Sequence, residues 1–396
     1  MSRHQRIWSL TRATFCKILR AKYAHALEEG SDPEPEAPFI VVSNHGNFFD
    51  PWILGTYQRK ALHIMMNDDG FRSGAISRWY LHGIGAFPKK KGASDLKAMK
   101  ATLSFLKAGE PVLIFPEGQA TWDGETQPIY GGIERMIKRA RCPLVVIRIR
   151  GGFLSKPWWS HSSRKGRISV KRTVYSAEDL STMDTDEIMR IVLEGIYNND
   201  IEDQDNLAIP FSGENLALGA ERLLWTCASC EAMDTLKTAG DRLSCTACGA
   251  SWRVDAHCHV HGEGDAAEAD NLKAWHRSDK ARARERIAAA GEGDVLLESA
   301  GVIGQRSDDE GEFEDLGAGA LRLTRDTLSF EPDDGGTLSW PVDALGSFAI
   351  QRKDVFEITA DGKDVRFDVT GGSPMKWLTH VRYLNGWEEI EARRVI

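Results

Sequence analysis

Short apolar runs alternate with longer helical patterns between residues 39 and 175. Six of these runs are short and apolar enough to predict buried strands: FIVVS, ALHIMM, IGAF, PVLIF, PLVVIRI and RISVKRTVY. In residues 94–109, apolar side chains recur on one helical face between Ser94, a suitable N-cap, and Gly109, a suitable stop. Strands that alternate with helices predict an α/β domain, here over residues 38–205, with a mostly parallel sheet flanked by helices.

Basic and apolar residues interleave at the start of the chain. Six basic residues and no acidic one occur before Leu27, which predicts a basic amphipathic helix over residues 1–29. Such a helix can lie in the headgroup layer of a membrane with its cations on anionic lipid, or it can pack on its own domain. The periodicity alone does not choose between the two. An acidic, proline-bearing joint follows at residues 30–38.

The pattern changes in the second half of the chain. Residues 177–197 and 214–225 are helix-like and lead into a cysteine-rich stretch, and residues 256–292 are polar enough to predict a linker or a solvated helix. In residues 293–396, five short runs predict strands: LRLTRDTLSFEP, GTLSWPV, SFAIQRK, VFEITAD and VRFDVT. They are broken by DDGG, KD and DGKD, and one helical pattern follows them. Several antiparallel strands closed by a C-terminal helix resemble a pleckstrin-homology or GRAM-like domain, a likeness of architecture without a specific motif.

Length and composition agree with several folded domains. The chain has 396 residues, of which 42% are hydrophobic and 27% charged, so we expect a mostly globular protein of two or three domains. No apolar run approaches the ~20 residues that span a bilayer, and the N-terminus lacks the apolar core of a secretory signal, so we expect a cytoplasmic protein. The net charge of −8 argues against general nucleic-acid binding.

The run SNHGNFFD carries the first candidate for chemistry. His45 and Asp50 follow the predicted strand FIVVS, and open α/β sheets hold their ligands at the carboxyl ends of strands. An imidazole titrates near neutral pH and can take a proton from a hydroxyl, while a carboxylate on its other nitrogen fixes the tautomer. An isolated pair at this spacing is more often incidental, with Asp50 capping a helix, so its companions decide the interpretation.

These companions resemble the four ordered blocks of the glycerolipid acyltransferase family, typified by the 1-acylglycerol-3-phosphate acyltransferases. Over residues 38–175 the blocks are, in order, Asn44, His45 and Asp50; GAFPKKKG with Lys89, Lys90 and Lys91; Phe115, Pro116, Glu117 and Gly118; and CPLVVIRI around Pro143. Three details depart from the family pattern. Asn47 stands where serine is common, the lysines replace an arginine, and Ala120 stands where the third block has an arginine.

The resemblance implies an O-acyltransferase that transfers an acyl group from acyl-CoA or acyl-carrier protein to a lysophospholipid, 1-acylglycerol-3-phosphate above all, in phospholipid biosynthesis. In this reaction His45 acts as general base on the lipid hydroxyl and Asp50 orients it, without a covalent acyl-enzyme. Asn44, Glu117, Gly118 and the three lysines bind the acceptor, with the lysines as point charges for its phosphate. The membrane surface is the implied partner, and the enzyme works as a peripheral protein on the cytoplasmic face.

Two alternatives stay open. Ala120 removes one expected cation, which keeps a related acyltransferase with a different lipid acceptor as an alternative. The second alternative is a catalytically silent scaffold whose acyltransferase domain only binds lipid. A hydrolase is disfavoured because no G-x-S-x-G nucleophile motif occurs in the chain. Nothing in the pattern indicates an oligomeric state.

Two CxxC pairs predict a metal site. Cys227 and Cys230 lie in CASC, Cys245 and Cys248 lie in CTACG, and fourteen residues separate the pairs. Four thiolates at this spacing form a closed tetrahedral site suited to structural zinc, which predicts a helix and zinc ribbon over residues 214–255. The nearby HCHVH is better explained as a polar loop. No motif indicates an organic cofactor.

Overall fold

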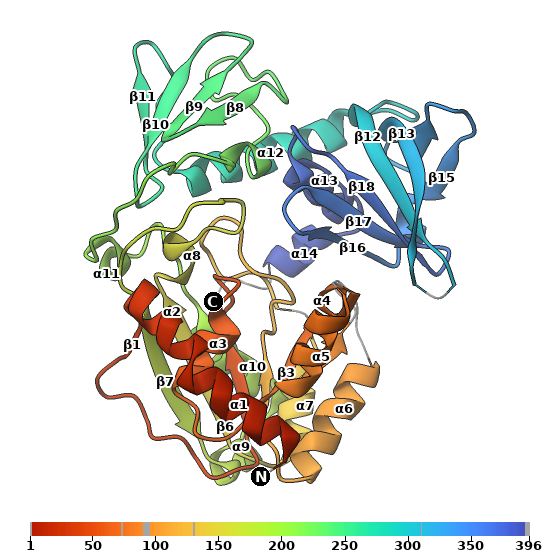
Figure 1. Cartoon of the computed structure of the whole chain (residues 1–396). Coiled ribbons are helices and arrows are strands. Elements are labelled where there is room, and N and C mark those ends of the chain that lie inside the picture. The colour runs from red at the N-terminus through yellow and green to blue at the C-terminus, as the bar shows by residue number, and fades with distance from the viewer. Residues whose placement is uncertain (1, 73, 90–95, 130, 310, 393–396) are drawn as a thin grey trace. The chain divides into compact units, whose positions relative to one another are not determined.

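The computed structural model describes residues 2–72, 74–89, 96–129, 131–309 and 311–392 (Figure 1). Lys90, Lys91 and Ser94, which the sequence singled out, lie outside the described residues. The chain divides into two compact units, of which the first comprises Met1–Trp158, Ser163–Gly213 and Ala392–Ile396 and the second Trp159–Ser162 and Glu214–Glu391. Within the described ranges, no helix is both long enough and apolar enough to cross a membrane.

A seven-stranded sheet forms the centre of the first unit. Its strands are β1 (Ala26–Leu27), β2 (Ile40–Ser43), β3 (His63–Asn67), β4 (Ala86–Lys89), β5 (Val112–Ile114), β6 (Leu144–Arg150) and β7 (Ser169–Tyr175). Their order is β1-β7-β6-β2-β5-β3-β4. Neighbouring strands are parallel except β6 and β7, which makes the sheet mixed. All six predicted strands are present, and β1 is an addition.

Helices pack on both faces of this sheet. They are α1 (Arg3–Ala13), α2 (Phe15–Tyr23), α3 (Asp50–Thr56), α4 (Asp69–Arg72), α5 (Ala75–Gly83), α6 (Leu96–Lys107), α7 (Ile133–Ala140), α8 (Gly152–Ser155), α9 (Ala177–Thr182), α10 (Thr185–Ile196) and α11 (Gln204–Leu207). In β2, Val41 belongs to a core shared with α1, α2, α3 and α5. Ile40 and Val42 belong to a second core shared with α6, α7, α9 and α10. Strands that are apolar on both faces are buried in this way.

Local signals set the ends of the helices. Helix α6 lies within the helix predicted for residues 94–109, and Gly109 follows it with φ of +82°, a left-handed conformation that glycine adopts without strain. The helix-like stretch 177–197 contains two helices, α9 and α10. A second capping box, formed by Asp184 and Glu187, starts α10 and explains the division.

The N-terminal segment differs from the single helix predicted for residues 1–29. Two helices, α1 and α2, are separated at Thr14, whose hydroxyl donates a hydrogen bond to the carbonyl oxygen of Leu10 at 2.8 Å. Trp8 and Leu19 are buried in the core beneath α3. Leu10 and Ile18 are instead 64% and 63% exposed. One face of the helix pair therefore packs on its own unit, and a second face keeps apolar side chains in solvent.

The second unit begins with a four-stranded antiparallel sheet in the order β11-β10-β9-β8. Its strands are β8 (Leu236–Ala239), β9 (Arg242–Cys245), β10 (Ser251–Val254) and β11 (Val260–Glu263). The helix predicted for residues 214–225 is wrong, because this segment holds only a 3-10 turn, η1 (Ala220–Arg222). Asn215 and Gly219 have φ of +58° and +98°, and these left-handed residues interrupt any α-helix here.

Helix α12 (Leu272–Ala289) confirms the helix among the two alternatives predicted for residues 256–292, a linker or a solvated helix, but it is not solvated on all sides. It has a buried face made of Leu272, Trp275, Asp279 and Ala283. These positions follow the helical spacing of three or four residues. The helix looked solvated in the sequence because Asp279 interrupts the apolar stripe on the buried face.

The C-terminal part of the second unit is a seven-stranded antiparallel sheet followed by helices. The strands are β12 (Leu297–Ser307), β13 (Phe313–Leu323), β14 (Thr327–Pro332), β15 (Leu338–Pro341), β16 (Ser347–Gln351), β17 (Val355–Ala360) and β18 (Lys363–Asp368). Their order is β15-β14-β13-β12-β18-β17-β16. Helices α13 (Pro374–Leu384) and α14 (Trp387–Ala392) follow, and Trp377 of α13 stacks on Phe356 of β17 with ring centroids 6.4 Å apart. The predicted antiparallel strands and closing helix are confirmed.

Candidate active site and metal centre

The first and third sequence blocks meet at one edge of the sheet. His45 follows β2 and Glu117 follows β5, and these neighbouring strands are parallel. Their carboxyl ends therefore lie side by side, as expected for ligand sites in open α/β sheets. The backbone N–H of His45 donates to Oε1 of Glu117 at 2.6 Å, and the N–H of Thr121 donates to the carbonyl oxygen of His45 at 2.9 Å.

His45 and Asp50 are in direct contact. The distance between Nδ1 of His45 and Oδ2 of Asp50 is 2.9 Å. The same oxygen accepts hydrogen bonds from the backbone N–H groups of Gly46 and Asn47, each at 2.8 Å. Asp50 is fully buried, whereas the His45 side chain is 18% exposed. A carboxylate that accepts from Nδ1–H leaves Nε2 unprotonated and able to act as a base.

The plane of the His45 ring is fixed by stacking. Phe115, the first residue of the third block, lies against the imidazole with ring centroids 4.3 Å apart and an interplanar angle of 25°. Together with the bond to Asp50, this contact restrains both the tilt and the rotation of the ring. A base held in one orientation needs no rearrangement before it accepts a proton.

Glu117 connects His45 to the loop opposite. Besides the His45 N–H, its carboxylate accepts the backbone N–H of Gln127, and the residue is only 2% exposed. The sequence predicts that Glu117 binds the acceptor. Its carboxylate is engaged with two backbone groups, so the geometry adds a second role, which is to hold the backbone of the base.

Replacing Glu117 by glutamine is expected to lower kcat/KM by about 10- to 100-fold, because one amide N–H then faces a backbone N–H beside His45. Steady-state kinetics of the purified variant measures this loss. Glu134→Gln is the matched control, since Glu134 is also buried and also accepts a backbone N–H, from Gly132, at the start of α7. Equal losses in both variants would contradict a role of Glu117 in the site.

Asn44 joins the first block to the fourth. Its side-chain amide donates to the carbonyl oxygen of Ile149 at 2.8 Å and accepts from the N–H of the same residue at 2.7 Å. This pair continues the ladder between β2 and β6 beyond its last backbone bonds. Asn44 was predicted to bind substrate. It lies at the site, but both polar atoms of its side chain bond to backbone.

The hollow beside His45 is also lined by residues that the sequence did not indicate. Asn44, His45 and Glu117 line it together with Thr126, Phe153 and Asn198, and no lysine or arginine is among its lining residues in the described part of the chain. Only the amide-rich run YNND at the end of α10 could have signalled Asn198.

The three lysines and Gly118 are the other residues predicted to bind the acceptor. Lys89 is the last residue of β4, and Lys90 and Lys91 lie outside the described residues. Gly118 is at the turn after Glu117, with φ of +74°. Ala120 is buried, so the third block places an apolar residue where the family has a cation.

The four predicted cysteine ligands converge on one point. Their Sγ atoms all lie within 4.8 Å of one another, and the Cys227–Cys248 and Cys230–Cys245 pairs are each 3.8 Å apart. Zinc bound tetrahedrally at about 2.3 Å from each sulfur sets sulfur atoms about 3.8 Å apart. The cluster therefore fits a closed tetrahedral metal site.

The two CxxC turns have the same backbone geometry. In the first, Glu231 N–H donates to the carbonyl oxygen of Cys227, and in the second, Gly249 N–H donates to that of Cys245, both at 3.0 Å. Glu231 and Gly249 occupy equivalent positions and both have positive φ, +60° and +78°. A non-glycine residue in this conformation costs energy, so Glu231 is held there by the turn itself.

The remaining cysteines take no part in this cluster. Cys16, Cys142 and Cys258 are buried, and none of the seven cysteines forms a disulfide. Burial raises the pKa of Cys142 to about 11, which keeps this thiol protonated and unreactive. The histidines of HCHVH lie beside Asp255, which is 3.1 Å from His261 and 3.4 Å from His259.

Part of the first unit is similar to a known family. The sequence model of the family described as Acyltransferase matches residues 25–150. These residues include β1 to β6 and the site residues from Asn44 to Thr126, whereas Phe153 and Asn198 lie beyond the match.

Two curated relatives each match about a third of the chain. A chloroplastic 1-acyl-sn-glycerol-3-phosphate acyltransferase of Brassica napus is 26% identical over 121 residues, 30% of this chain and 35% of that protein. A 1-acyl-sn-glycerol-3-phosphate acyltransferase of Bacillus subtilis is 27% identical over 139 residues, 34% of this chain and 65% of that protein. The chain thus spans less than two thirds of the length of either relative.

Among solved structures, the 1-acyl-sn-glycerophosphate acyltransferase PlsC of Thermotoga maritima matches 48% of this chain and 80% of its own, with 17% identity and a TM-score of 0.40. The residues matched by the family model, 25–150, include the His45–Asp50 pair. This chain is thus similar to the acyltransferase family over residues 25–150, and similar in sequence to two 1-acyl-sn-glycerol-3-phosphate acyltransferases.

Proposed function

We propose that this chain is an O-acyltransferase that acylates the free hydroxyl of 1-acylglycerol-3-phosphate, with acyl-CoA or acyl-carrier protein as donor, in phospholipid biosynthesis. The observation that carries the proposal is the contact of 2.9 Å between His45 and Asp50 beside the hollow at the sheet edge. The activity named for the Brassica napus and Bacillus subtilis relatives supports the choice of acceptor.

The arrangement supports direct transfer of the acyl group from the donor to the acceptor, without a covalent acyl-enzyme. Nδ1 of His45 donates to Asp50, so Nε2 accepts the proton of the acceptor hydroxyl as its oxygen attacks the thioester carbonyl carbon. The new C–O ester bond forms and the C–S bond breaks. The proton on Nε2 then passes to the leaving thiolate. Asp50 stabilises the imidazolium between these steps, and the N–H groups of Gly46 and Asn47 keep its oxygen in place.

The acceptor phosphate is assigned to the lysines of the second block, of which Lys89 is the described member at the end of β4. A second candidate function has a specific observation in its favour. Because Ala120 is a buried alanine where the family has a cation, an acyltransferase for a lipid without a phosphate fits the third block equally well.

An acceptor panel decides between these functions. Purified protein on liposomes is given an acyl donor with 1-acylglycerol-3-phosphate, another lysophospholipid or an uncharged lipid alcohol, and kcat/KM is measured for each. We expect the highest value for 1-acylglycerol-3-phosphate. A preference for the uncharged alcohol would overturn the phosphate assignment, and transfer to no acceptor with either donor would favour the silent scaffold.

We assign the N-terminal helix pair to the membrane surface, with the protein as a peripheral enzyme on a cytoplasmic face. Leu10 and Ile18 expose apolar side chains on helices that carry six basic residues. The residue next to the site, Phe48, is also 52% exposed. Apolar contacts combined with cations favour an anionic lipid surface. Equal binding to anionic and neutral vesicles in a sedimentation assay would contradict this assignment.

The remaining assignments concern the second unit. We assign its C-terminal sheet and helix α13 to a pleckstrin-homology or GRAM-like domain, on the antiparallel strand order and the closing helix. A solved structure in which α13 does not pack on the sheet would contradict this assignment.

We assign one structural zinc ion to Cys227, Cys230, Cys245 and Cys248, because four sulfurs at tetrahedral separations leave no open position for substrate.

A further inference from the structure

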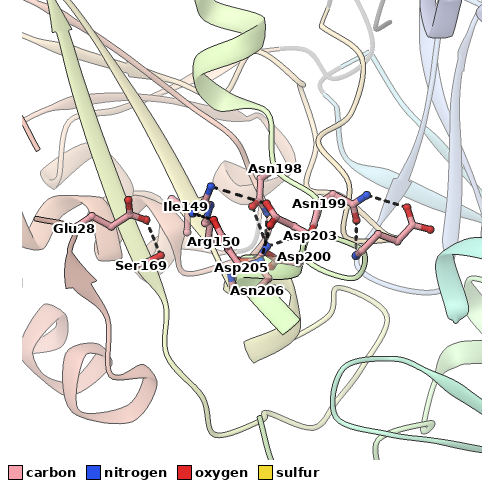
Figure 2. A network of polar contacts seen from close by, with 12 residues as sticks. Glu28, Ile149, Arg150, Ser169, Asn198, Asn199, Asp200, Asp203, Asp205 and Asn206 are labelled. Carbon is pink, nitrogen blue, oxygen red and sulfur yellow. Dashed lines mark hydrogen bonds and ion pairs between the residues drawn. The ribbon is translucent and has the colours of Figure 1, made fainter. Parts of the chain in front are cut away.

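An aspartate beyond the family match lies buried behind the active site. Asp200 follows α10 and is 1% exposed, and Figure 2 shows it in a polar network with Asn198 and Asn206. Its carboxylate accepts backbone N–H groups from Gly151 at 2.7 Å, Phe153 at 2.8 Å and Leu154 at 3.4 Å, and side-chain amides from Asn198 at 2.7 Å and Asn206 at 3.2 Å. Hydrogen bonds to a buried carboxylate are among the stronger ones in proteins.

The backbone that Asp200 holds is in contact with the loop that carries His45 and Asp50. Asn47 donates from its side chain to the carbonyl oxygen of Gly152 at 3.0 Å. The two segments also approach closely at Gly46, since a Cβ there would lie 3.0 Å from the nitrogen of Phe153. Gly46 and Asn47 are the residues whose N–H groups bind Asp50. A shift of the 151–154 turn would therefore be passed on to the carboxylate that orients the base.

Asp200 also binds the opposite wall of the hollow. Its own N–H donates to the carbonyl oxygen of Gly124 at 2.9 Å. Two residues earlier, the N–H of Asn198 donates to Oγ1 of Thr126 at 2.9 Å. Both Thr126 and Asn198 line the hollow. The segment around Asp200 thus joins the 124–126 wall to the 151–154 turn.

Two other aspartates of the same segment are more exposed than Asp200 and lie near the side chain of Arg150. Asp205 is 74% exposed and 3.2 Å from Arg150, and Asp203 is 30% exposed and 4.0 Å from the same arginine. Both are drawn in Figure 2. Exposed ion pairs of this kind contribute about 0–1 kcal/mol to stability. They give matched controls with the same change of charge.

We propose that Asp200 is a positioning residue for the acyl transfer, because it holds the 151–154 turn against Gly46 and Asn47 and so fixes Asp50 against His45. The catalytic part of this inference rests on the proposed function. The structural part concerns only the contact between His45 and Asp50, and it can be tested without any substrate.

The test compares Asp200→Asn with Asp205→Asn in the full chain. Asparagine keeps the shape of the side chain but turns an amide N–H toward backbone N–H donors. We expect kcat to fall by about 10- to 100-fold in Asp200→Asn with a smaller change in KM, and no change in Asp205→Asn, since a misplacement of about 1 Å is enough for such a loss. Asn206→Ala removes one donor to Asp200 and should give an intermediate loss.

A second readout uses the imidazole of His45. Nuclear magnetic resonance of protein with labelled histidines, with the His45 signal assigned by its loss in His45→Ala, reports the tautomer and the pKa of this ring. Asp200→Asn should increase the Nε2-protonated tautomer, and Asp205→Asn should leave it unchanged. An unaltered His45 signal in folded Asp200→Asn protein would overturn the inference. Absence of acyl transfer by the wild type would overturn the proposed function instead and leave this readout valid.

Discussion

Replacing both Cys227 and Cys230 by serine is expected to abolish zinc binding and the cooperative folding of the second unit. Two of the four sulfurs that lie within 4.8 Å of one another are then lost. Structural zinc in small domains binds with about 10–16 kcal/mol of apparent free energy, and this energy is folding energy. This is comparable to the about 5–15 kcal/mol that stabilises a whole domain.

The effect should reach beyond the ribbon because the first CxxC turn is bonded to α12. The N–H of Trp225 donates to the buried carboxylate of Asp279 at 3.0 Å, and Nε1 of Trp275 donates to the carbonyl oxygen of Thr226 at 2.8 Å. Trp252 of β10 packs on Trp275 with ring centroids 4.8 Å apart. Trp225 and Thr226 directly precede Cys227, so these hydrogen bonds depend on the conformation of the first CxxC turn.

Metal analysis and thermal unfolding of the purified proteins measure the result. We expect one zinc per wild-type chain, none in the double variant, and loss of the unfolding transition of the second unit. Cys258→Ala is the control, because Cys258 is buried in the same unit but outside the cluster, and it should keep its zinc. No metal in the wild type, or metal retained by the double variant, would contradict the assignment.

Replacing His45 by alanine is expected to lower kcat by about 10²- to 10⁴-fold, the usual contribution of a general base. The ring is stacked on Phe115 and bonded to Asp50, and alanine loses both contacts together with the nitrogen that accepts the proton. Initial rates of acyl transfer measure the loss, with His82→Ala as control, since His82 lies on α5 and is exposed. A variant without His45 that keeps wild-type kcat would remove the proposed base.

The acyltransferase blocks could be found in the sequence because each is local. Apolar strands followed at once by His45 or Glu117 predict side chains at the carboxyl edge of a sheet, and the structure places both there. The contact between His45 and Glu117 depends on the pairing of β2 with β5, and these two strands are more than sixty residues apart in the chain. The bond between Glu117 and the His45 backbone was therefore beyond sequence reasoning.

Strand β12 was missed because its sequence is poor in strand-forming residues. Gly301 and Gly304 lower its propensity, and the strand forms because β13 and β18 pair with it on either side. At Gly304 a Cβ would lie 2.6 Å from the ring of Phe330, so the glycine makes room for core packing. Tertiary packing rather than local preference decides this element.

Asp200 was missed for a different reason. Its surroundings, NNDIEDQDN, have the composition of a solvated loop, and nothing in them separates a buried aspartate from the exposed Asp203 and Asp205. What distinguishes Asp200 is its set of bonds to residues 151–154, almost fifty positions earlier. Only the fold brings these groups together.

The proposed function is tested most directly by the formation of phosphatidate by the purified full chain from 1-acylglycerol-3-phosphate and an acyl donor on liposomes. We expect product formation by the wild type at a rate that His45→Ala lowers by about 10²- to 10⁴-fold. Wild-type protein that is folded and zinc-loaded, yet forms no phosphatidate with acyl-CoA or with acyl-carrier protein, would contradict the proposed function.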